Sequence, residues 1–594
     1  MARARSALVA LSLCACARDP RHAGNAADDL ALPQAPKRLD LVRATADGSQ
    51  PKPALIGVLE TELARNFDEL KKHSSEPPYF LSYQAIDQQS ETIEASFGAL
   101  VSSSDDRWRS LDVDVRVGTP KLDNSHRLRG ETESGRDFTR SAWLPLEDDP
   151  LAVRSVAWLT TNAEYRRAEE DLVRVRANKR VLVDEEDVSD DFSAEPASHF
   201  YEKPASLSVD RAAWEARARR WSIPFRDHPN ILDSSVTFEA TAETRYFTST
   251  EGASLDVART HARVDVTARA TADDGMQLER TESADADADA PDGLPSDEAV
   301  KARVDRVIVD LEALRKAPAI EPYAGPAILD GRAAAVFFHE IFGHRVEGHR
   351  QKDEEEGQTF ARKIGQPVMP SFLDVFDDPS IHAINGVPLN GYYPFDDEGI
   401  GGQRATLVED GVLRGFLLSR SSVRGFLHSN GHGRREHGHR VVSRQANLVV
   451  DPARTTTPAA LKQRLIDDVV AQHRPFGLRF HEITGGFTNT TRSGSQAFKV
   501  LPVMVYRVYP DGHEELVRGV DLEGTPLAAL SRIEAAANDF ETFNGVCGAE
   551  SGWVPVSATS PSILVSQIEV TRKEKSQDRP PLLPAPAAAP GGKP

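Results

Sequence analysis

Three segments in the first half of the chain alternate apolar and polar side chains with a period of two. They are Leu111–Val117, Val236–Ala240 and Arg263–Val266. This period places every second side chain on the same face of a strand, which is typical of half-buried strands in an antiparallel sheet. The chain is therefore predicted to contain an antiparallel sheet well before its midpoint.

Helical patterns flank these strands. The apolar residues between Leu55 and Leu70 recur at helical spacing with charged residues between them, which predicts an amphipathic helix. Further helices are predicted around Ala163–Asn178 and over Ser296–Lys316, where Ser296 is a suitable N-cap followed by acidic residues. Together the helices and strands predict a mixed α/β N-terminal domain over residues 51–318.

The pattern changes after Tyr323 to short strands separated by turns. Glu409-Asp410-Gly411 and Tyr509-Pro510-Asp511-Gly512 each predict a hairpin. Ala327–Gly331 predicts a short strand and turn, and Arg332–Phe338 predicts a helix that leads into His339. The expected fold class is α+β, with a mainly antiparallel β C-terminal domain over residues 319–575 that carries this helix.

Composition predicts the character of three other segments. Residues 17–50 are polar and rich in Pro and Ala, which predicts a flexible tether with order beginning near Ala54. The alternating Asp and Ala residues of 283–290 are expected to form a solvated loop, because they lack the turn glycine and closing glutamate of a calcium loop. Residues 576–594 are expected to be a disordered tail.

The N-terminus resembles an export sequence. Arg3 and Arg5 precede a short apolar stretch, Ala7–Leu13, and small residues follow, as in a signal peptide over residues 1–16. Leu13-Cys14-Ala15-Cys16 resembles the bacterial lipobox, which favours lipidation of Cys16, or alternatively of Cys14. The expected location is the extracytoplasmic cell envelope, with membrane contact only through this lipid; a plain secretory peptide is the alternative.

Charge and cysteine content restrict the possible partners. The formal net charge of −20 argues against a nucleic-acid partner, which would require a basic face. Cleavage after Ala15 would remove Cys14, and lipidation would occupy Cys16, so Cys547 would remain as the single thiol. An unpaired cysteine in an exported chain is buried, intermolecular or functional.

The segment His339-Glu340-Ile341-Phe342-Gly343-His344 has the composition of a catalytic zinc site. Two imidazoles can bind the metal, and a glutamate that does not bind it can take a proton from a zinc-bound water. The two histidines are five residues apart, however, which places them about 140° apart around an ideal helix. Gly343 permits a helix end that could return His344 to the same side. The spacing alone does not distinguish metal ligands from unrelated histidines.

The wider sequence resembles the TldD/PmbA family of metallopeptidases. His-Glu-x-x-x-His followed by Glu347-Gly348 is similar to the family signature, and further landmarks follow in the family order over about residues 296–570. These are Gly365–Val368, Val375–Asp378, Asp397–Gly399, Asn430–Glu436 and Asn544–Gly548.

The resemblance implies a zinc-dependent peptidase of the catalytic type. Its metal ligands would be His339, His344 and Cys547, leaving a fourth position for water that Glu340 activates as general base. The resemblance also implies small or unfolded peptides as substrates, bound as an added β-strand. Family members form homodimers or heterodimers with an inactive subunit, and the same assembly is expected for this chain.

Other candidate residues are supported less directly. Glu347 could support a histidine ligand or only stabilise local structure, while His349 stands where many relatives carry Asp. Arg434, Arg435 and Glu436 resemble a family segment near the cleft, where arginine could hold a substrate carboxylate; structural ion pairing is the alternative. The histidines between 428 and 439 are expected to lie in a solvated loop, not in a second metal cluster.

Two other functions remain open from the sequence. The chain could be an envelope binding or partner protein that retains zinc for structure alone, in which case a fourth protein ligand would close the site. It could also be a binding protein without metal.

Overall fold

The fold is described from a computed structural model of the chain. It describes residues 32–44, 47–128, 137–181, 187–287, 294–352, 356, 359–488, 490, 498–573 and 583. The predicted signal peptide with Cys14 and Cys16, and the predicted C-terminal tail apart from Leu583, lie outside these residues. No helix among the described residues is long and apolar enough to cross a membrane.

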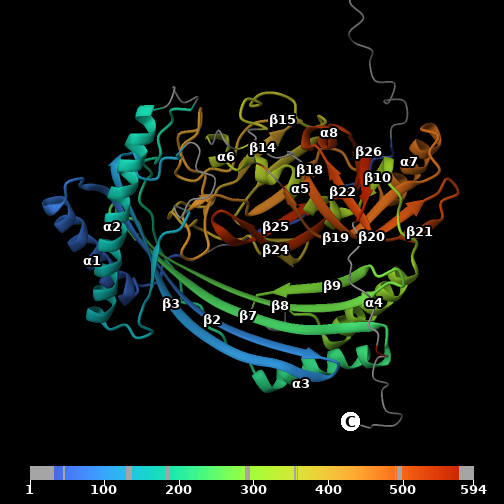
Figure 1. The fold of residues 1–594 in the computed structure, drawn as a ribbon, viewed down its shortest axis with the longest axis horizontal. Coiled ribbons are helices and arrows are strands. Elements are labelled where there is room, and N and C mark those ends of the chain that lie inside the picture. Colours follow the sequence, from blue (N-terminus) through green and yellow to red (C-terminus); the bar gives the residue numbers. More distant parts are fainter. Residues whose placement is uncertain are drawn as a thin grey trace, which may run out of the picture.

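A long, curved and mainly antiparallel sheet dominates the N-terminal half (Figure 1), with β6 parallel to β8. Its strand order is β4-β3-β2-β7-β8-β6, with β5 beside β3 and β9 beside β8. All three segments predicted from the period of two are confirmed as strands, since they lie within β3, β7 and β8. The strands are β2 (Pro78–Ser96), β3 (Ala99–Thr119), β4 (Leu122–Asp123), β5 (Arg140–Trp143), β6 (His199–Tyr201), β7 (Ile231–Ser249), β8 (Ser254–Thr271) and β9 (Gln277–Ala286).

Helices cover this sheet in two groups. Apolar side chains of α3 (Arg211–Ser222) and α4 (Asp297–Lys316) form one core with β7 and β8. Those of α1 (Ala54–His73) and α2 (Pro150–Val181) form another with β2 and β3. The helices predicted near residues 55–70, 163–178 and 296–316 are confirmed, and the Ser296 hydroxyl accepts the N–H of Ala299 at 3.3 Å as the predicted N-cap. Helix α3 was not predicted.

Two expectations for the N-terminal half are wrong. The acidic repeat of residues 283–290 was expected to be a loop, but residues 283–286 belong to β9, where Ala284 and Ala286 are buried and Asp285 bonds to His261. Residues 288–290 lie outside the described residues. The expected tether is ordered from residue 32 to 44: Leu41–Arg43 form β1, which pairs with β12 (Ile381–Ile384). Alternation of a small residue with aspartate is itself a strand pattern, since alanine can face a core.

The C-terminal half contains two sheets that enclose a buried helix. The helix is α5 (Gly331–Ile341), and it packs against β19 and β20 of one sheet and against β24 and β25 of the other. The first sheet contains β10 (Tyr323–Leu329), β19 (Gly477–Thr488), β20 (Phe498–Val508), β21 (Glu514–Val517), β22 (Val520–Gly524), β23 (Ile533–Ala536) and β26 (Ile563–Arg572). The second contains β11 (Leu373–Asp377), β14 (Ala405–Glu409), β15 (Val412–Leu413), β18 (Asn447–Pro452), β24 (Glu541–Ala549) and β25 (Gly552–Ser560).

These sheets are mainly antiparallel, as predicted, and two strand pairs are parallel: β10 with β19, and β18 with β25. Both predicted hairpins are confirmed, between β14 and β15 and between β20 and β21. At the first hairpin Asp410 and Gly411 both have positive φ, as a two-residue turn between twisted strands requires. The α+β fold class is confirmed. Shorter elements are β13 (Val387–Pro388), β16 (Gly433–Arg434), β17 (Val442–Ser443), η2 (Ile223–Asp227), η4 (Gly343–Val346), α6 (His349–Lys352), α7 (Pro458–Ala471) and α8 (Pro526–Ser531).

Candidate metal centre

The end of helix α5 places both histidines on one side. The helix ends at Ile341, and Phe342 closes it by donating its N–H to the carbonyl of Phe338. The 3-10 turn η4 follows at once and carries His344. The chain therefore leaves the ideal helical path between the two histidines, as predicted from their spacing of five residues.

Gly343 is required for space and not for an unusual backbone angle. A Cβ atom at this position would lie 1.8 Å from Oε1 of Gln445, a side chain that is buried beneath the turn. Gly343 is not among the glycines with positive φ. Only a residue without a side chain can let Gln445 approach this closely.

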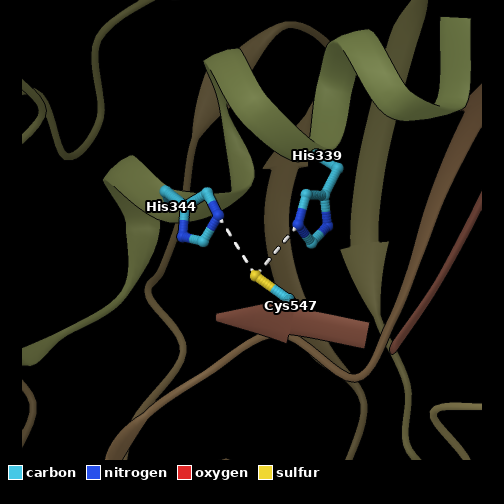
Figure 2. Close-up of side chains that lie close together, drawn as sticks. All are labelled: His339, His344 and Cys547. Carbon is cyan, nitrogen blue, oxygen red and sulfur yellow. Dashed lines mark hydrogen bonds between the residues drawn. The ribbon is translucent and has the colours of Figure 1, made fainter. Parts of the chain in front are cut away.

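The third member of the cluster, Cys547, comes from strand β24. It pairs with Val554 on β25 and points toward α5, as Figure 2 shows. The Cys547 Sγ lies 3.3 Å from Nε2 of His339 and 3.3 Å from Nε2 of His344. The ligand atoms of the three residues all lie within 4.8 Å of one another. Segments about two hundred residues apart thus meet at one point.

The three residues fit a zinc ion. A thiolate and two imidazoles are ligand types that zinc prefers, and all three side chains are buried. Burial raises the pKa of Cys547, but the two imidazoles outweigh this effect and its pKa lies well below the ordinary value. Burial lowers the pKa of His344, but Cys547 and Glu347 outweigh it and its pKa lies well above the ordinary value. The two shifts together describe a thiolate paired with a protonated imidazole in the metal-free protein, and a bound metal would displace the proton of His344.

No fourth His, Cys, Asp or Glu joins this cluster among the residues that the structure describes. A closed site with four protein ligands is therefore not seen in that part of the chain. Three protein ligands and one open position are typical of catalytic zinc sites.

Glu340 lies beside the cluster on the same helix. Its carboxyl group is buried, and Oε2 has no hydrogen-bond partner within the described residues. Burial raises the pKa of Glu340, although His339 and His344 act in the opposite direction. Gly486 of β19 packs against it, since a Cβ there would lie 2.8 Å from Cγ of Glu340. The carboxyl group is thus positioned by close packing and left free to exchange a proton.

Glu347 is fully buried behind the second histidine. Its Oε1 lies 3.2 Å from Nδ1 of His344, and its Oε2 accepts from Nε of Arg350 at 2.8 Å. A carboxylate on the second ring nitrogen fixes the orientation of a metal-binding histidine. Glu347 lies at ion-pair distance from the second ring nitrogen of His344, although its Oε1 makes no hydrogen bond within the described residues.

Three residues that hold Glu347, His349 or Cys547 in place were not predicted. Arg444, which is fully buried, donates to the carbonyl of Cys547 at 2.6 Å and lies 3.5 Å from Oε1 of Glu347. Arg350 donates to Glu550 at 2.9 Å, which also bonds to His349. Nothing in the sequence distinguishes Arg444 from the other arginines nearby. Glu550, by contrast, follows Cys547 by three residues, and this position in the sequence could have suggested that it lies near the metal cluster.

Arg434, Arg435 and Glu436 lie outside the cluster. Arg434 donates to the carbonyls of Gln445 and Pro555 at 2.7 and 2.6 Å, and Arg435 donates to Oε1 of Gln84 at 3.0 and 2.8 Å. Both arginines are buried, and these bonds favour the structural alternative over capture of a substrate carboxylate. Glu436 accepts the N–H of Trp553 at 2.9 Å and so supports the β24–β25 hairpin.

The histidines of residues 428–439 do not approach the cluster. His432 is fully buried and bonds to Asn430 at 2.8 Å, and its Nε2 lies 3.3 Å from Asp377. The His428 side chain is 74% exposed. His432 therefore contradicts the expectation of a wholly solvated loop, because a buried carboxylate satisfies its ring.

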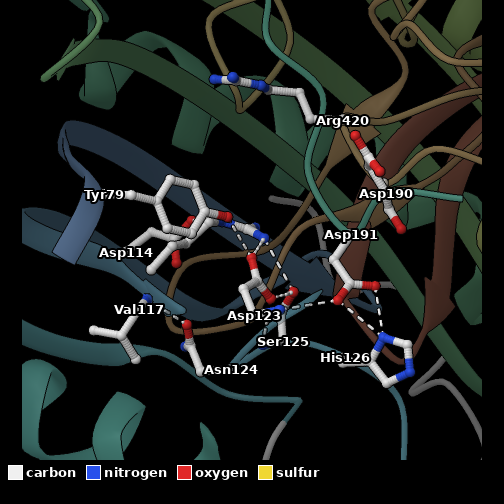
Figure 3. A network of polar contacts seen from close by, with 12 residues as sticks. Tyr79, Asp114, Val117, Asp123, Asn124, Ser125, His126, Asp190, Asp191 and Arg420 are labelled. Atoms are coloured by element: carbon white, nitrogen blue, oxygen red, sulfur yellow. Dashed lines mark hydrogen bonds and ion pairs between the residues drawn. The ribbon is translucent and has the colours of Figure 1, made fainter. Parts of the chain in front are cut away.

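The N-terminal domain contacts α6, which follows the turn η4 that carries His344. Lys352 of α6 donates to Asp191 Oδ1 at 3.0 Å and to the carbonyls of Ser189 and Asp190. Asp191 also bonds to His126 at 2.8 Å, in the polar network that Figure 3 shows around Asp123. This network ties α6 to the first domain.

Comparison with known proteins identifies the C-terminal half. Residues 323–572 match the profile of the PmbA/TldA metallopeptidase C-terminal domain. A metalloprotease of Archaeoglobus fulgidus is 28% identical over 249 residues, which are 41% of this chain and 53% of that protein. The metalloprotease TldD homologue of Haemophilus influenzae is 28% identical over 282 residues, 46% of this chain and 55% of that protein. The zinc metalloprotease TldD homologue of Saccharolobus solfataricus is 25% identical over 253 residues, 42% of this chain and 52% of that protein. The matches span about half the length of these relatives.

Solved structures extend the similarity to both halves at the level of the fold. TldE from Thermococcus kodakarensis gives a TM-score of 0.57 at 12% identity, over 87% of this chain and 100% of that chain. A proposed modulator of a DNA gyrase from Thermotoga maritima gives a TM-score of 0.56 at 16% identity, over 86% of this chain and 100% of that chain. At these identities the likeness shows the fold alone.

Proposed function

Because the chain belongs to the TldD/PmbA family, whose metallopeptidase C-terminal domain it carries in residues 323–572, we propose that it is a zinc-dependent peptidase. The observation that carries this proposal is the convergence of His339, His344 and Cys547 beside the buried carboxyl group of Glu340, whose Oε2 has no hydrogen-bond partner among the described residues. The name of the Saccharolobus solfataricus relative, a zinc metalloprotease, supports zinc as the metal.

The proposed chemistry divides between the metal and Glu340. Zinc, when bound, polarises a peptide carbonyl and lowers the pKa of water that it coordinates. His339, His344 and Cys547 would hold the zinc ion, and the Glu340 carboxylate would accept a proton from the attacking water and donate it to the leaving amine. Burial raises the pKa of Glu340 in the metal-free protein, and a bound zinc ion would act in the opposite direction and favour the carboxylate that accepts the proton.

His344 and Cys547 are held by the residues around them. Glu347 fixes the ring of His344 through Nδ1, and Arg444 holds the main chain at Cys547. Both ligands are thus oriented by buried partners, which keeps the cluster in shape during turnover.

We propose small or unfolded peptides as the substrates. The position of β24 supports this, because it is the terminal strand of its sheet and carries Cys547. An extended peptide can add to the free edge of such a strand. The family resemblance supports a homodimer or a heterodimer with an inactive subunit, and the N-terminal sequence supports export with a lipid on Cys16 or Cys14.

The test compares zinc content and hydrolysis of an unstructured peptide mixture in the wild type, Glu340→Ala and Cys547→Ser. Glu340→Ala should keep zinc, and its rate of hydrolysis should fall by a factor of about 10²–10⁴, since the substitution removes proton transfer. Cys547→Ser should lose zinc and activity together, since a ligand is gone.

His428→Ala serves as the histidine control, because this side chain is exposed and lies outside the cluster. It should keep both zinc and activity. Loss of zinc in His428→Ala would favour a closed, structural site and the non-catalytic alternative. Full hydrolysis by Glu340→Ala would refute the mechanism, and unchanged zinc in Cys547→Ser would refute the ligand assignment.

A further inference from the structure

A cavity of about 900 Å³ lies in the C-terminal domain, apart from the metal cluster. Its walls come from α8 and β23, from residues 367–372, and from the N-terminal segment at Leu32 and Gln34. None of the metal-cluster residues lines it. The volume lies within the range of about 300–1,000 Å³ that is typical of small-molecule sites.

The N-terminal segment is fixed in the wall of this cavity. The main-chain N–H of Ala35 donates to the carbonyl of Thr455 at 2.7 Å, and the Thr456 hydroxyl donates to the carbonyl of Pro33 at 2.7 Å. Both threonines line the cavity and are buried. The wall is therefore built by defined hydrogen bonds.

Positive charge gathers around the cavity. Lys363, Arg454, Arg464 and Arg532 line it, with Glu534 as the single acidic side chain of the lining. This contrasts with the chain as a whole, whose formal net charge is −20. Most of the protein would repel an anion, whereas this cavity would attract one.

Two of the four cations have no carboxylate partner. Arg464 lies 3.0 Å from Asp468 and 3.4 Å from Glu534 and is therefore neutralised. Lys363 and Arg454 make no ion pair with any residue that the structure describes. Arg454 instead lies over the ring of Phe372, 5.2 Å from its centroid. An incoming anion would thus meet two cations that are not paired with a carboxylate among the described residues.

The remaining lining is apolar. Val368, Met369 and Phe372 are buried, and Leu527 is 38% exposed beside them. A bare inorganic anion would leave these side chains without contacts. A ligand that also carries an apolar chain would use both parts of the wall.

We propose that this cavity binds an amphiphilic anion, with a carboxylate or phosphate head between Lys363 and Arg454 and an apolar chain against Phe372 and Met369. Arginine and lysine form charge-assisted hydrogen bonds with such heads, and these are stronger than neutral ones. The inference does not depend on the peptidase activity. A soluble fatty acid or alkyl phosphate and an anionic phospholipid share this chemistry.

The test measures binding of decyl phosphate, decanoate and inorganic phosphate to the full chain by calorimetry. Vesicles of phosphatidylglycerol and of phosphatidylcholine form a second arm, measured by flotation. The variant Lys363→Gln/Arg454→Gln removes both free cations. Its matched control is Lys316→Gln/Arg166→Gln, which removes two exposed cations of the N-terminal domain that make no ion pair with described residues.

Decyl phosphate or decanoate should bind the wild type and the control equally, and the cavity variant at least about tenfold more weakly. An unchanged midpoint of urea unfolding in the cavity variant shows that it is folded. Selective flotation with phosphatidylglycerol, lost in the cavity variant, identifies a membrane source; binding of the soluble ligands alone identifies a soluble one. Equal binding by both variants, or inorganic phosphate binding as tightly as decyl phosphate, would overturn the proposal.

Discussion

Replacing Glu347 with glutamine should weaken zinc binding although Glu347 does not touch the metal. The carboxylate is fully buried and lies 3.2 Å from His344, 2.8 Å from Arg350 and 3.5 Å from Arg444. Glutamine keeps the shape but not the charge, so His344 loses the partner that fixes its ring. Loss of such a partner typically costs 10–100-fold in metal affinity, or about 1.4–2.8 kcal/mol.

The same substitution should lower the stability of the metal-free protein. Burial raises the pKa of Glu347, but His344 and Arg350 outweigh burial and bring its pKa to about 2, against an ordinary 4.5. This difference corresponds to about 3 kcal/mol, in line with the cost of about 3–5 kcal/mol for breaking a buried ion pair. Because the folded pKa is lowered, this stability is present above pH 4.5 and is lost as the pH falls toward 2.

The assay is zinc affinity by chelator competition, together with urea unfolding of the metal-free protein at pH 7. Glu356→Gln is the matched control: Glu356 also pairs with Arg350, at 3.0 Å, but none of its contacts involves His344. Glu356→Gln should lose stability and keep the wild-type zinc affinity. The reasoning is refuted if Glu347→Gln binds zinc as tightly as Glu356→Gln does.

Two further predictions test the packing and the charges. Gly343→Ala should destabilise the fold by about 1–3 kcal/mol in urea unfolding, because its Cβ would meet Gln445, although alanine ordinarily favours helical turns. The added substitution Gln445→Ala should recover part of the lost stability. No recovery would contradict the steric argument. Asp256 is fully buried with Oδ2 unpaired within the described structure, and burial raises its pKa to about 7 from 3.8. A raised carboxyl pKa favours the folded state at low pH and penalises it as the pH rises from 3.8 through 7, so Asp256→Asn should be more stable than the wild type by about 2–4 kcal/mol at pH 8 and equal to it near pH 4. A pH-independent difference in thermal unfolding would contradict this assignment.

The sequence predicted the local features of the candidate site well. With histidines five residues apart and a glycine before the second, two ligands on one side were possible only if the helix ended between them, and α5 does end at Ile341. Cys547, which the family resemblance implied as the third ligand, lies beside both histidines. The first feature depends on a short segment, which a sequence contains, and the second on similarity to a family over a longer stretch of chain.

The supporting side chains could not be predicted in the same way. Arg444 reaches the carbonyl of Cys547 only because β24 and the segment before β18 meet in three dimensions. Arg434 and Arg435 face buried carbonyls and Gln84 for the same reason. Segment 283–286 was misassigned because its charge was given more weight than its period of two, although alanine can fill the inner face of a strand as well as a larger residue.

X-ray absorption at the zinc edge of the purified protein tests the central claim most directly. The proposed site predicts one zinc per chain with two nitrogen ligands at about 2.0–2.1 Å, one sulfur at about 2.3 Å and one further oxygen from water. The sulfur contribution should disappear, together with most of the zinc, in Cys547→Ser. A zinc shell without sulfur in the wild type, or one with a third histidine in place of water, would contradict the account.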